Sequence, residues 1–216
     1  GAILQPALQA GRLTLETGRE LGPGLSLDEL RKTHAAVFLA LGLPGAASLG
    51  SASGVLDALS FLRQAKQGAF PSLAGKRVAV LGGGNTAMDA AGTARRLGAQ
   101  DVYLVYRRSF AELPAWPAER DEVLALGVHI MVLTQPLGYA VNPAGELTGV
   151  RIARTELGEP DASGRRRPRP VPGSDGVLAV DLAVEAIGQQ APEDLRAALA
   201  GVPFTADGLV QADPAT

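Results

Sequence analysis

The stretch VAVLGGGNTAMDAAGTARRLGAQDVYLVYRRS, residues 78–109, decides the fold class of this chain. An apolar strand is expected at residues 77–81, and it runs into a glycine turn that is followed by a helical pattern at residues 86–97. A second apolar strand is expected at residues 102–106. Because a helix joins the two strands, we expect them to be parallel, with a right-handed crossover. The stretch therefore predicts an α/β fold with a Rossmann-like dinucleotide-binding domain around a parallel central sheet.

The residues before this unit predict further elements. Residues 13–16 read as a short strand, and Ser26 with Glu29 three positions later forms a capping box, which marks the start of a helix. Residues 35–42, AAVFLALG, form a continuous apolar run that is typical of a strand buried on both faces. Residues 55–67 carry the apolar periodicity of an amphipathic helix.

The residues after the unit first continue the alternation and then change pattern. A helix near residues 118–126 and a strand at residues 128–133 extend the α/β arrangement. A hairpin is predicted at residues 137–154, with its turn in the sequence NPAG. A polar loop at residues 158–176 and a buried strand at residues 178–188 follow. We therefore expect the parallel sheet to be accompanied by a β-hairpin or meander.

The glycine turn matches the G-x-G-x-x-G/A dinucleotide fingerprint, with Gly82, Gly84 and Ala87 at its key positions. Gly82 allows a tight exit from the strand, Gly84 lets a pyrophosphate approach the backbone, and Ala87 lets the helix pack close to the strand. The N–H groups of the first helical turn and the helix dipole favour an anion there. Glycine-rich turns also form for packing alone, but the strand before this turn and the helix after it favour a nucleotide site. The predicted site comprises Gly82, Gly83, Gly84, Asn85, Thr86 and Ala87.

Two adjacent arginines follow the second strand, where NAD-binding units of this shape carry an acidic residue that accepts from the ribose 2′-hydroxyl. Arg107 lies 25 positions beyond Gly82 (107 − 82), and Arg108 follows it. A guanidinium suits a 2′-phosphate because it forms charge-assisted, often bidentate hydrogen bonds. The alternative is that both arginines only solvate a strand end. The missing acid and the position favour NADPH as the cofactor.

The composition excludes several other kinds of site. The 216 residues include no cysteine, which rules out disulfides, thiolate nucleophiles and cysteine-ligated metal clusters within them. The two histidines, His34 and His129, lie far apart in the sequence, and we interpret both as structural. No side chain stands out as catalytic, so we expect the chemistry to come from a bound cofactor.

Charge and hydropathy favour a globular cytoplasmic protein. Hydrophobic residues make up 46% of the chain and charged residues 19%, and the net charge of −2 argues against a nucleic-acid partner. No apolar run approaches the roughly 20 residues that span a bilayer, and the first residues carry no signal-peptide pattern. We expect a cytoplasmic location without a membrane partner.

Charged residues on the predicted helices have two interpretations each. Asp89, Arg95 and Arg96 lie on the helix of the fingerprint, and we interpret them as surface charges, with Asp89 near Arg96. Glu119 and Glu122 offer a carboxylate pair for acid–base catalysis or a solvated helix face. Hydride transfer between cofactors needs no protein base, so the solvated face is our interpretation.

The remaining polar and aromatic candidates are also open to two interpretations. The run RRRPR, residues 165–169, attracts an acidic partner or solvates a hairpin loop, and we favour the loop. Tyr106 and Trp116 flank the adenine or nicotinamide or serve as packing groups, and packing is the commoner role.

These features together resemble the NADPH-binding domain of the glutamate synthase small-subunit family of flavoprotein oxidoreductases. Its relatives include the pyridine-nucleotide part of dihydropyrimidine dehydrogenase and adrenodoxin-reductase-like proteins. The resemblance covers roughly residues 10–210. The segments that carry it are VAVLGGGNTAMDAAGTARRLGA, VYLVYRRS, ELPAWPAERDEVLALGV, VEAIGQ, AVFLALG and GVLDALSFL.

The resemblance implies a chain in which hydride passes from NADPH to FAD, with no catalytic side chain. It implies a partial FAD-domain segment and linker helix at residues 1–70, the NADPH-binding domain at residues 71–190 and the start of a return to the FAD domain at residues 191–216. It also adds Gly188, in VEAIGQ, to the cofactor-binding residues. A larger glutamate synthase-type or iron–sulfur subunit is the implied partner.

The sequence departs from the family pattern in three respects. No strand followed by G-x-G-x-x-G precedes residue 76, the cysteine-rich iron–sulfur region is missing, and VEAIGQQAPED has one residue more than expected after AIGQ. We therefore expect an excised piece of a longer flavoprotein, with FAD bound only in the full-length protein. The alternative function is a non-catalytic module for nucleotide binding or subunit docking.

Overall fold

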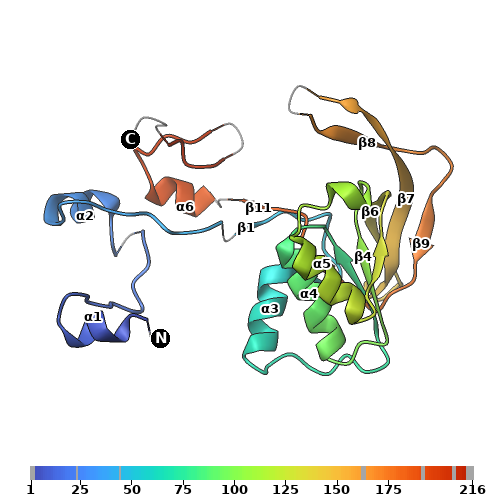
Figure 1. Ribbon diagram of the computed structural model, residues 1–216, viewed down its shortest axis with the longest axis horizontal. Coiled ribbons are helices and arrows are strands. Elements are labelled where there is room, and N and C mark those ends of the chain that lie inside the picture. Colours follow the sequence, from blue (N-terminus) through green and yellow to red (C-terminus); the bar gives the residue numbers. More distant parts are fainter. Residues whose placement is uncertain are drawn as a thin grey trace. The chain divides into compact units, whose positions relative to one another are not determined.

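The computed structural model describes residues 3–22, 24–43, 45–161, 164–190, 193–205 and 208–212. The chain forms two compact units, and each is described by itself. The larger unit spans Ala46–Gln189 and contains the sequence that predicts the dinucleotide fold (Figure 1). The smaller unit combines Gly1–Gly45 with Gln190–Thr216.

The larger unit is built on a five-stranded parallel sheet with the order β2-β10-β3-β4-β5. Its strands are β2 (Val55–Asp57), β10 (Leu182–Glu185), β3 (Arg77–Leu81), β4 (Asp101–Val105) and β5 (His129–Met131). β3 has the predicted bounds and lies in the centre, with its last four residues buried. The α/β fold with a parallel sheet is thus confirmed.

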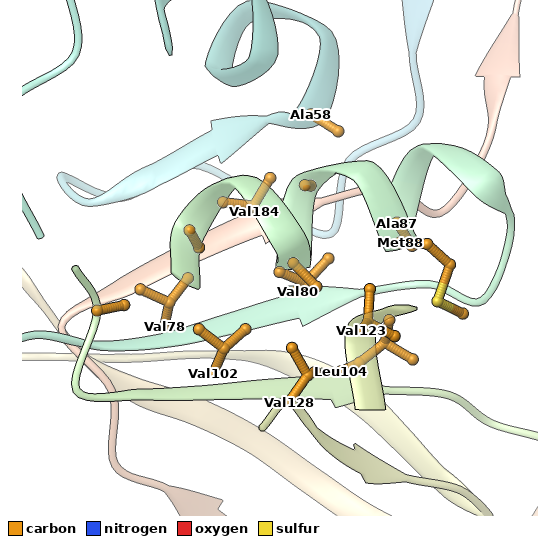
Figure 2. Close-up of a cluster of buried hydrophobic side chains, with 14 of the residues drawn as sticks. Ala58, Val78, Val80, Ala87, Met88, Val102, Leu104, Val123, Val128 and Val184 are labelled. Atoms are coloured by element: carbon orange, nitrogen blue, oxygen red, sulfur yellow. The ribbon is translucent and has the colours of Figure 1, made fainter. Parts of the chain in front are cut away.

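Three helices cover one face of this sheet. They are α3 (Ala58–Lys66), α4 (Asn85–Arg96) and α5 (Pro117–Ala125). Figure 2 shows Val78 and Val80 of β3 beneath α4, beside Val102 and Leu104 of the neighbouring strand. The underside of α4 is rich in alanine, so the helix packs close to the sheet.

An antiparallel sheet covers the other face. It consists of β6 (Thr134–Val141), β7 (Leu147–Pro160), β8 (Arg166–Pro170) and β9 (Gly176–Leu178). Ala79 and Leu81 of β3 belong to a second core cluster with Leu147 and Val150 of this sheet. Because side chains alternate along a strand, the odd positions of β3 face this layer and the even positions face the helices. This explains the continuous apolar run of β3.

The predicted hairpin is confirmed, whereas the prediction of a polar loop at residues 158–176 is wrong. β6 and β7 pair antiparallel, and the turn closes with the N–H of Gly145 donating to the carbonyl of Asn142 over 2.9 Å. β7 continues as far as Pro160 and pairs with β8, so much of the expected loop is a two-stranded ribbon. The ribbon is polar on both sides and therefore lacks the apolar alternation by which strands are recognised.

The helix expected at residues 55–67 is partly wrong, because its first residues form β2 and the helix starts at Ala58. Asp57 explains the change: its carboxylate accepts from the N–H of Ser60 over 2.9 Å and caps α3. This hydrogen bond and its neighbours lower the pKa of Asp57, although burial opposes them. β2 and α3 lie in the larger unit, which begins at Ala46, and the boundary at residue 70 stays a prediction.

The smaller unit contains short helices. They are α1 (Gln5–Gln9), α2 (Leu27–Thr33) and α6 (Glu193–Ala198). The capping box of Ser26 and Glu29 is confirmed at the start of α2. The short strands β1 (Gly45–Ala46) and β11 (Gln189–Gln190) lie where the chain passes from one unit to the other.

The strands expected at residues 13–16 and 35–42 are wrong. Neither segment pairs with another strand in the part of the chain that the structure describes, and Phe38 is 91% exposed. An apolar run becomes a buried strand only where neighbouring strands supply hydrogen bonds and a core. Among the described residues, no helix is long and apolar enough to cross a membrane.

Candidate functional site

The candidate site lies at the carboxyl edge of the parallel sheet, where the chain leaves β3, β4 and β10. A cleft of about 370 Å³ opens there, within the range of small-molecule sites. It brings together six residues of the predicted cofactor site: Gly82, Gly83, Gly84, Arg107, Arg108 and Gly188. In open α/β sheets this edge is the usual place for a ligand.

The first two glycines of the turn are required by their surroundings. Gly82 has φ +139°, and a Cβ atom there would lie 2.3 Å from the carbonyl oxygen of Ala186. A Cβ atom on Gly83 would lie 2.5 Å from the ring of Tyr106. Around Gly84, by contrast, no heavy atom lies within 4 Å of that position. The turn therefore packs tightly on the protein side and leaves open space at Gly84.

Helix α4 begins at this open space. Gly84 is its N-cap and has no side chain to cap the first-turn N–H groups, while its carbonyl accepts from Ala87 and Met88. An uncapped N-terminus of a 12-residue helix favours a bound anion.

The other three predicted residues of this turn do not line the cleft. The Asn85 side chain accepts from the N–H of Trp116 over 3.0 Å and so joins α4 to the start of α5. Thr86 is half-buried, and Ala87 is fully buried in the core. The assignment of these residues to the cofactor site stays a prediction.

The backbone of the arginine pair is held by β7 and by the segment between β5 and β6. The Thr155 hydroxyl donates to the carbonyl of Arg107 over 2.7 Å, and the N–H of Leu133 donates to the carbonyl of Arg108 over 2.8 Å. Leu133 has φ +49°, a strained conformation for a leucine at a point where the chain returns from β5 into β6. These contacts fix the backbone of both arginines while their side chains line the cleft.

Arg108 carries an unsatisfied donor. Its Nε atom is buried and has no hydrogen-bond partner among the described residues. A buried, unpaired donor on a cation costs free energy, which a phosphate oxygen would recover. The donor set thus fits the phosphate group of a nucleotide.

Tyr106 forms a wall of the cleft. Its hydroxyl donates to the carbonyl of Glu112 over 2.7 Å, and its ring packs against Gly83. Burial raises the pKa of Tyr106. Trp116, in contrast, is 68% exposed and does not line the cleft. The packing interpretation therefore describes Tyr106 better than Trp116.

A buried carboxylate beside the cleft is missing from the sequence-based prediction. Glu185, the last residue of β10, is 5% exposed. It accepts from the hydroxyl of Tyr139 over 2.5 Å and from the N–H of Leu49 over 2.7 Å. Burial and this carboxylate raise the pKa of Tyr139 far above its usual value. Leu49 lines the cleft, so Glu185 supports the wall of the cleft. In the sequence, the sign of this role is an acidic residue within the apolar run LAVDLAVEAIG.

The other charged candidates act in packing. Arg96 pairs with Glu122 over 3.1 Å rather than with Asp89. Arg95 is more than a surface charge, because its guanidinium donates to the carbonyls of three residues: Ala99, Gln100 and Leu126. His129 contacts Asp101 over 3.4 Å. The described residues include no group of three or more acidic or histidine side chains placed to hold a metal.

The chain is similar to subunits of NADPH-dependent oxidoreductases. It is 40% identical over 216 residues to the "NADP(+)-dependent formate dehydrogenase subunit beta" of Moorella thermoacetica, a match that covers 97% of this chain and 30% of that protein. It is 39% identical over 183 residues to the "Glutamate synthase [NADPH] small chain" of Escherichia coli, which covers 78% of this chain and 39% of that protein. The chain thus spans about a third of the length of these relatives.

Solved structures confirm the fold. Mycobacterium tuberculosis FprA in complex with NADPH matches with a TM-score of 0.65 and 21% identity, over 84% of this chain and 55% of that one. The thioredoxin reductase of T. acidophilum matches with a TM-score of 0.53 and 16% identity, over 82% of this chain and 49% of that one. The resemblance to glutamate synthase small subunits is confirmed by the relatives above. Since the family model for pyridine nucleotide-disulphide oxidoreductases matches residues 12–216, the chain belongs to that family.

Proposed function

We propose that this chain is the NADPH-binding region of an FAD-dependent oxidoreductase and positions NADPH to pass its hydride to the flavin. One observation carries the proposal: the glycine turn and the arginine pair line the same cleft. The first suits a pyrophosphate and the second a 2′-phosphate, the group that distinguishes NADPH from NADH.

Different residues of the cleft bind different parts of the dinucleotide. Gly82, Gly83 and Gly84 let the pyrophosphate approach the first turn of α4, whose N–H groups face the open space. Arg107 and Arg108 hold the 2′-phosphate from the end of β4. Gly188, with φ +144° and no heavy atom within 4 Å of its missing Cβ, leaves room for the cofactor on the side of β10.

The charge of the cleft supports an anionic ligand. The described residues that line it include three arginines and no aspartate or glutamate, although the chain as a whole carries a net charge of −2. Three cations among the lining residues, with no carboxylate among them, favour a ligand with several phosphate oxygens.

The chemistry belongs to the cofactors: NADPH supplies a hydride, and FAD takes it up together with a proton. This chain's part is to bind and orient the nucleotide. We propose that the smaller unit, residues 1–45 and 190–216, belongs to the FAD domain, and the greater length of the relatives leaves room for the rest of that domain. The names "subunit beta" and "small chain" of those relatives support a partner subunit. We propose that this partner is a larger subunit of the glutamate synthase or iron–sulfur type.

Calorimetric titration of the purified protein with NADP⁺ and NAD⁺ tests the assignment, because the oxidised forms bind without a redox reaction. A hydrogen bond between charged partners contributes about 1.5–3 kcal/mol, so we expect NADP⁺ to bind about 10- to 100-fold more tightly. Equal binding of the two nucleotides, or tighter binding of NAD⁺, contradicts the role of the arginines. Binding of neither contradicts the proposed function.

A further inference from the structure

The ribbon of β7 and β8 brings a third arginine to the cleft. The ribbon extends from the body of the larger unit (Figure 1). At its end the carboxylate of Asp161 accepts from the N–H of Arg165 over 3.1 Å, and the N–H of Asp161 donates to the carbonyl of Arg165 over 2.9 Å. These two bonds fix the backbone of Arg165 at the start of β8. Arg165 lines the cleft together with Arg107 and Arg108.

Arg165 differs in this respect from its neighbours in the run RRRPR. Arg166 donates to the carbonyls of Gly158 and Leu157 on β7, over 3.1 and 3.3 Å. Arg167 lies 3.9 Å from the carboxylate of Asp161. These two stabilise the ribbon itself. The prediction of a solvated loop therefore misses the one arginine of the run that lines the cleft.

We propose that Arg165 is a third phosphate-binding residue for the dinucleotide, supplied by the ribbon from outside the parallel sheet. This inference rests on the proposed function. The arginine pair comes from the end of β4, and Arg165 comes from a different layer of the fold, so a bound phosphate is held from two sides. A guanidinium donates two parallel hydrogen bonds to one phosphate, which gives the ribbon a specific contact with the ligand.

The test compares Arg165→Ala with Arg169→Ala in titrations with NADP⁺ and NAD⁺. Arg169 is a matched control because it is an exposed arginine of the same run, opposite Glu156, and does not line the cleft. We expect Arg165→Ala to weaken NADP⁺ binding about tenfold, since Arg165 is exposed and its contact lies at the lower end for charged hydrogen bonds. Arg169→Ala should change it less than about twofold. Arg165→Lys keeps the charge but loses the two parallel donors of the guanidinium, so its loss of NADP⁺ affinity should lie between those of the two alanine variants.

The pattern of loss identifies the phosphate. A loss confined to NADP⁺ assigns Arg165 to the 2′-phosphate, and an equal loss with NAD⁺ assigns it to the pyrophosphate. Unchanged binding of both nucleotides by Arg165→Ala, or the same loss with Arg169→Ala, overturns the inference. In that case NADP⁺ still binds the parent protein, so the proposed function stands, whereas its failure shows as no binding by the parent.

Discussion

Two charged side chains beside the cleft differ in their hydrogen bonding. At the end of β10, Glu185 is buried and satisfied by the Tyr139 hydroxyl and the Leu49 N–H. Beyond the end of β4, Arg108 keeps a buried Nε without a partner among the described residues. A satisfied buried carboxylate stabilises the structure around it, whereas a buried donor atom left without a partner asks for an explanation, and we propose a ligand. The strands on the two sides of β3 thus differ: β10 carries a carboxylate that supports the wall of the cleft, and β4 leads to the arginine that we propose binds the ligand.

The largest expected effect concerns the contact between β3 and β10, on the side of Glu185. Gly82→Ala places a Cβ atom 2.3 Å from the carbonyl oxygen of Ala186, in a backbone conformation that alanine adopts poorly. We expect the free energy of unfolding to fall by about 3 kcal/mol or more. Urea denaturation followed by circular dichroism measures the change.

Gly84→Ala is the matched control in the same turn, because no heavy atom lies within 4 Å of the new methyl group. It should cost less than about 1 kcal/mol of stability, yet weaken NADP⁺ and NAD⁺ alike by about tenfold, since the methyl group occupies the space proposed for the pyrophosphate. If the Gly82→Ala protein is as stable as the parent, Gly82 is not required for packing. If Gly84→Ala leaves nucleotide affinity unchanged, Gly84 does not make room for the pyrophosphate.

A smaller effect is expected from Tyr139→Phe, which removes one hydrogen bond from Glu185. Hydrogen bonds to charged groups contribute about 1.5–3 kcal/mol, so we expect a loss of about 2 kcal/mol in the free energy of unfolding. The affinity for NADP⁺ should change by less than about threefold, because neither Tyr139 nor Glu185 lines the cleft. A large loss of affinity with normal stability would assign this pair to the ligand.

The same tyrosine gives a pH dependence. Burial and Glu185 raise the folded-state pKa of Tyr139 above that of the unfolded chain, and burial also raises that of Tyr106. The unfolded state therefore loses its phenolic protons first, so the contribution of these two tyrosines to stability is constant up to about pH 10 and falls above it. Unfolding measured between pH 8 and about 11 should show a shallower fall for Tyr139→Phe than for the parent protein.

The sequence predicts the centre of the larger unit well. β3 and β4 are buried on both faces, so each strand appears in the sequence as an apolar run. The glycine turn follows from the same pattern. The apolar run at residues 35–42 carries the same signal, but it forms no strand in the described structure. Hydrophobicity alone does not say which strands are available as partners.

The sequence predicts the arginine pair because its position is set by local spacing along one βαβ unit. The sequence does not single out Arg165 within the run RRRPR, or Glu185, because their places depend on pairings between distant segments. The ribbon brings Arg165 to the cleft through the pairing of β7 with β8, and Glu185 meets Tyr139 across 46 positions of sequence. Such contacts leave no periodic trace in a single sequence.

The central claim is that the cleft distinguishes NADP⁺ from NAD⁺ through Arg107 and Arg108. Its most direct test is the ratio of the two dissociation constants in the parent protein and in the double variant Arg107→Ala/Arg108→Ala. We predict that the double variant loses at least about tenfold in affinity for NADP⁺, retains its affinity for NAD⁺ within about twofold, and unfolds within about 1 kcal/mol of the parent protein. A double variant that folds normally and keeps the parent's preference for NADP⁺ would contradict the account.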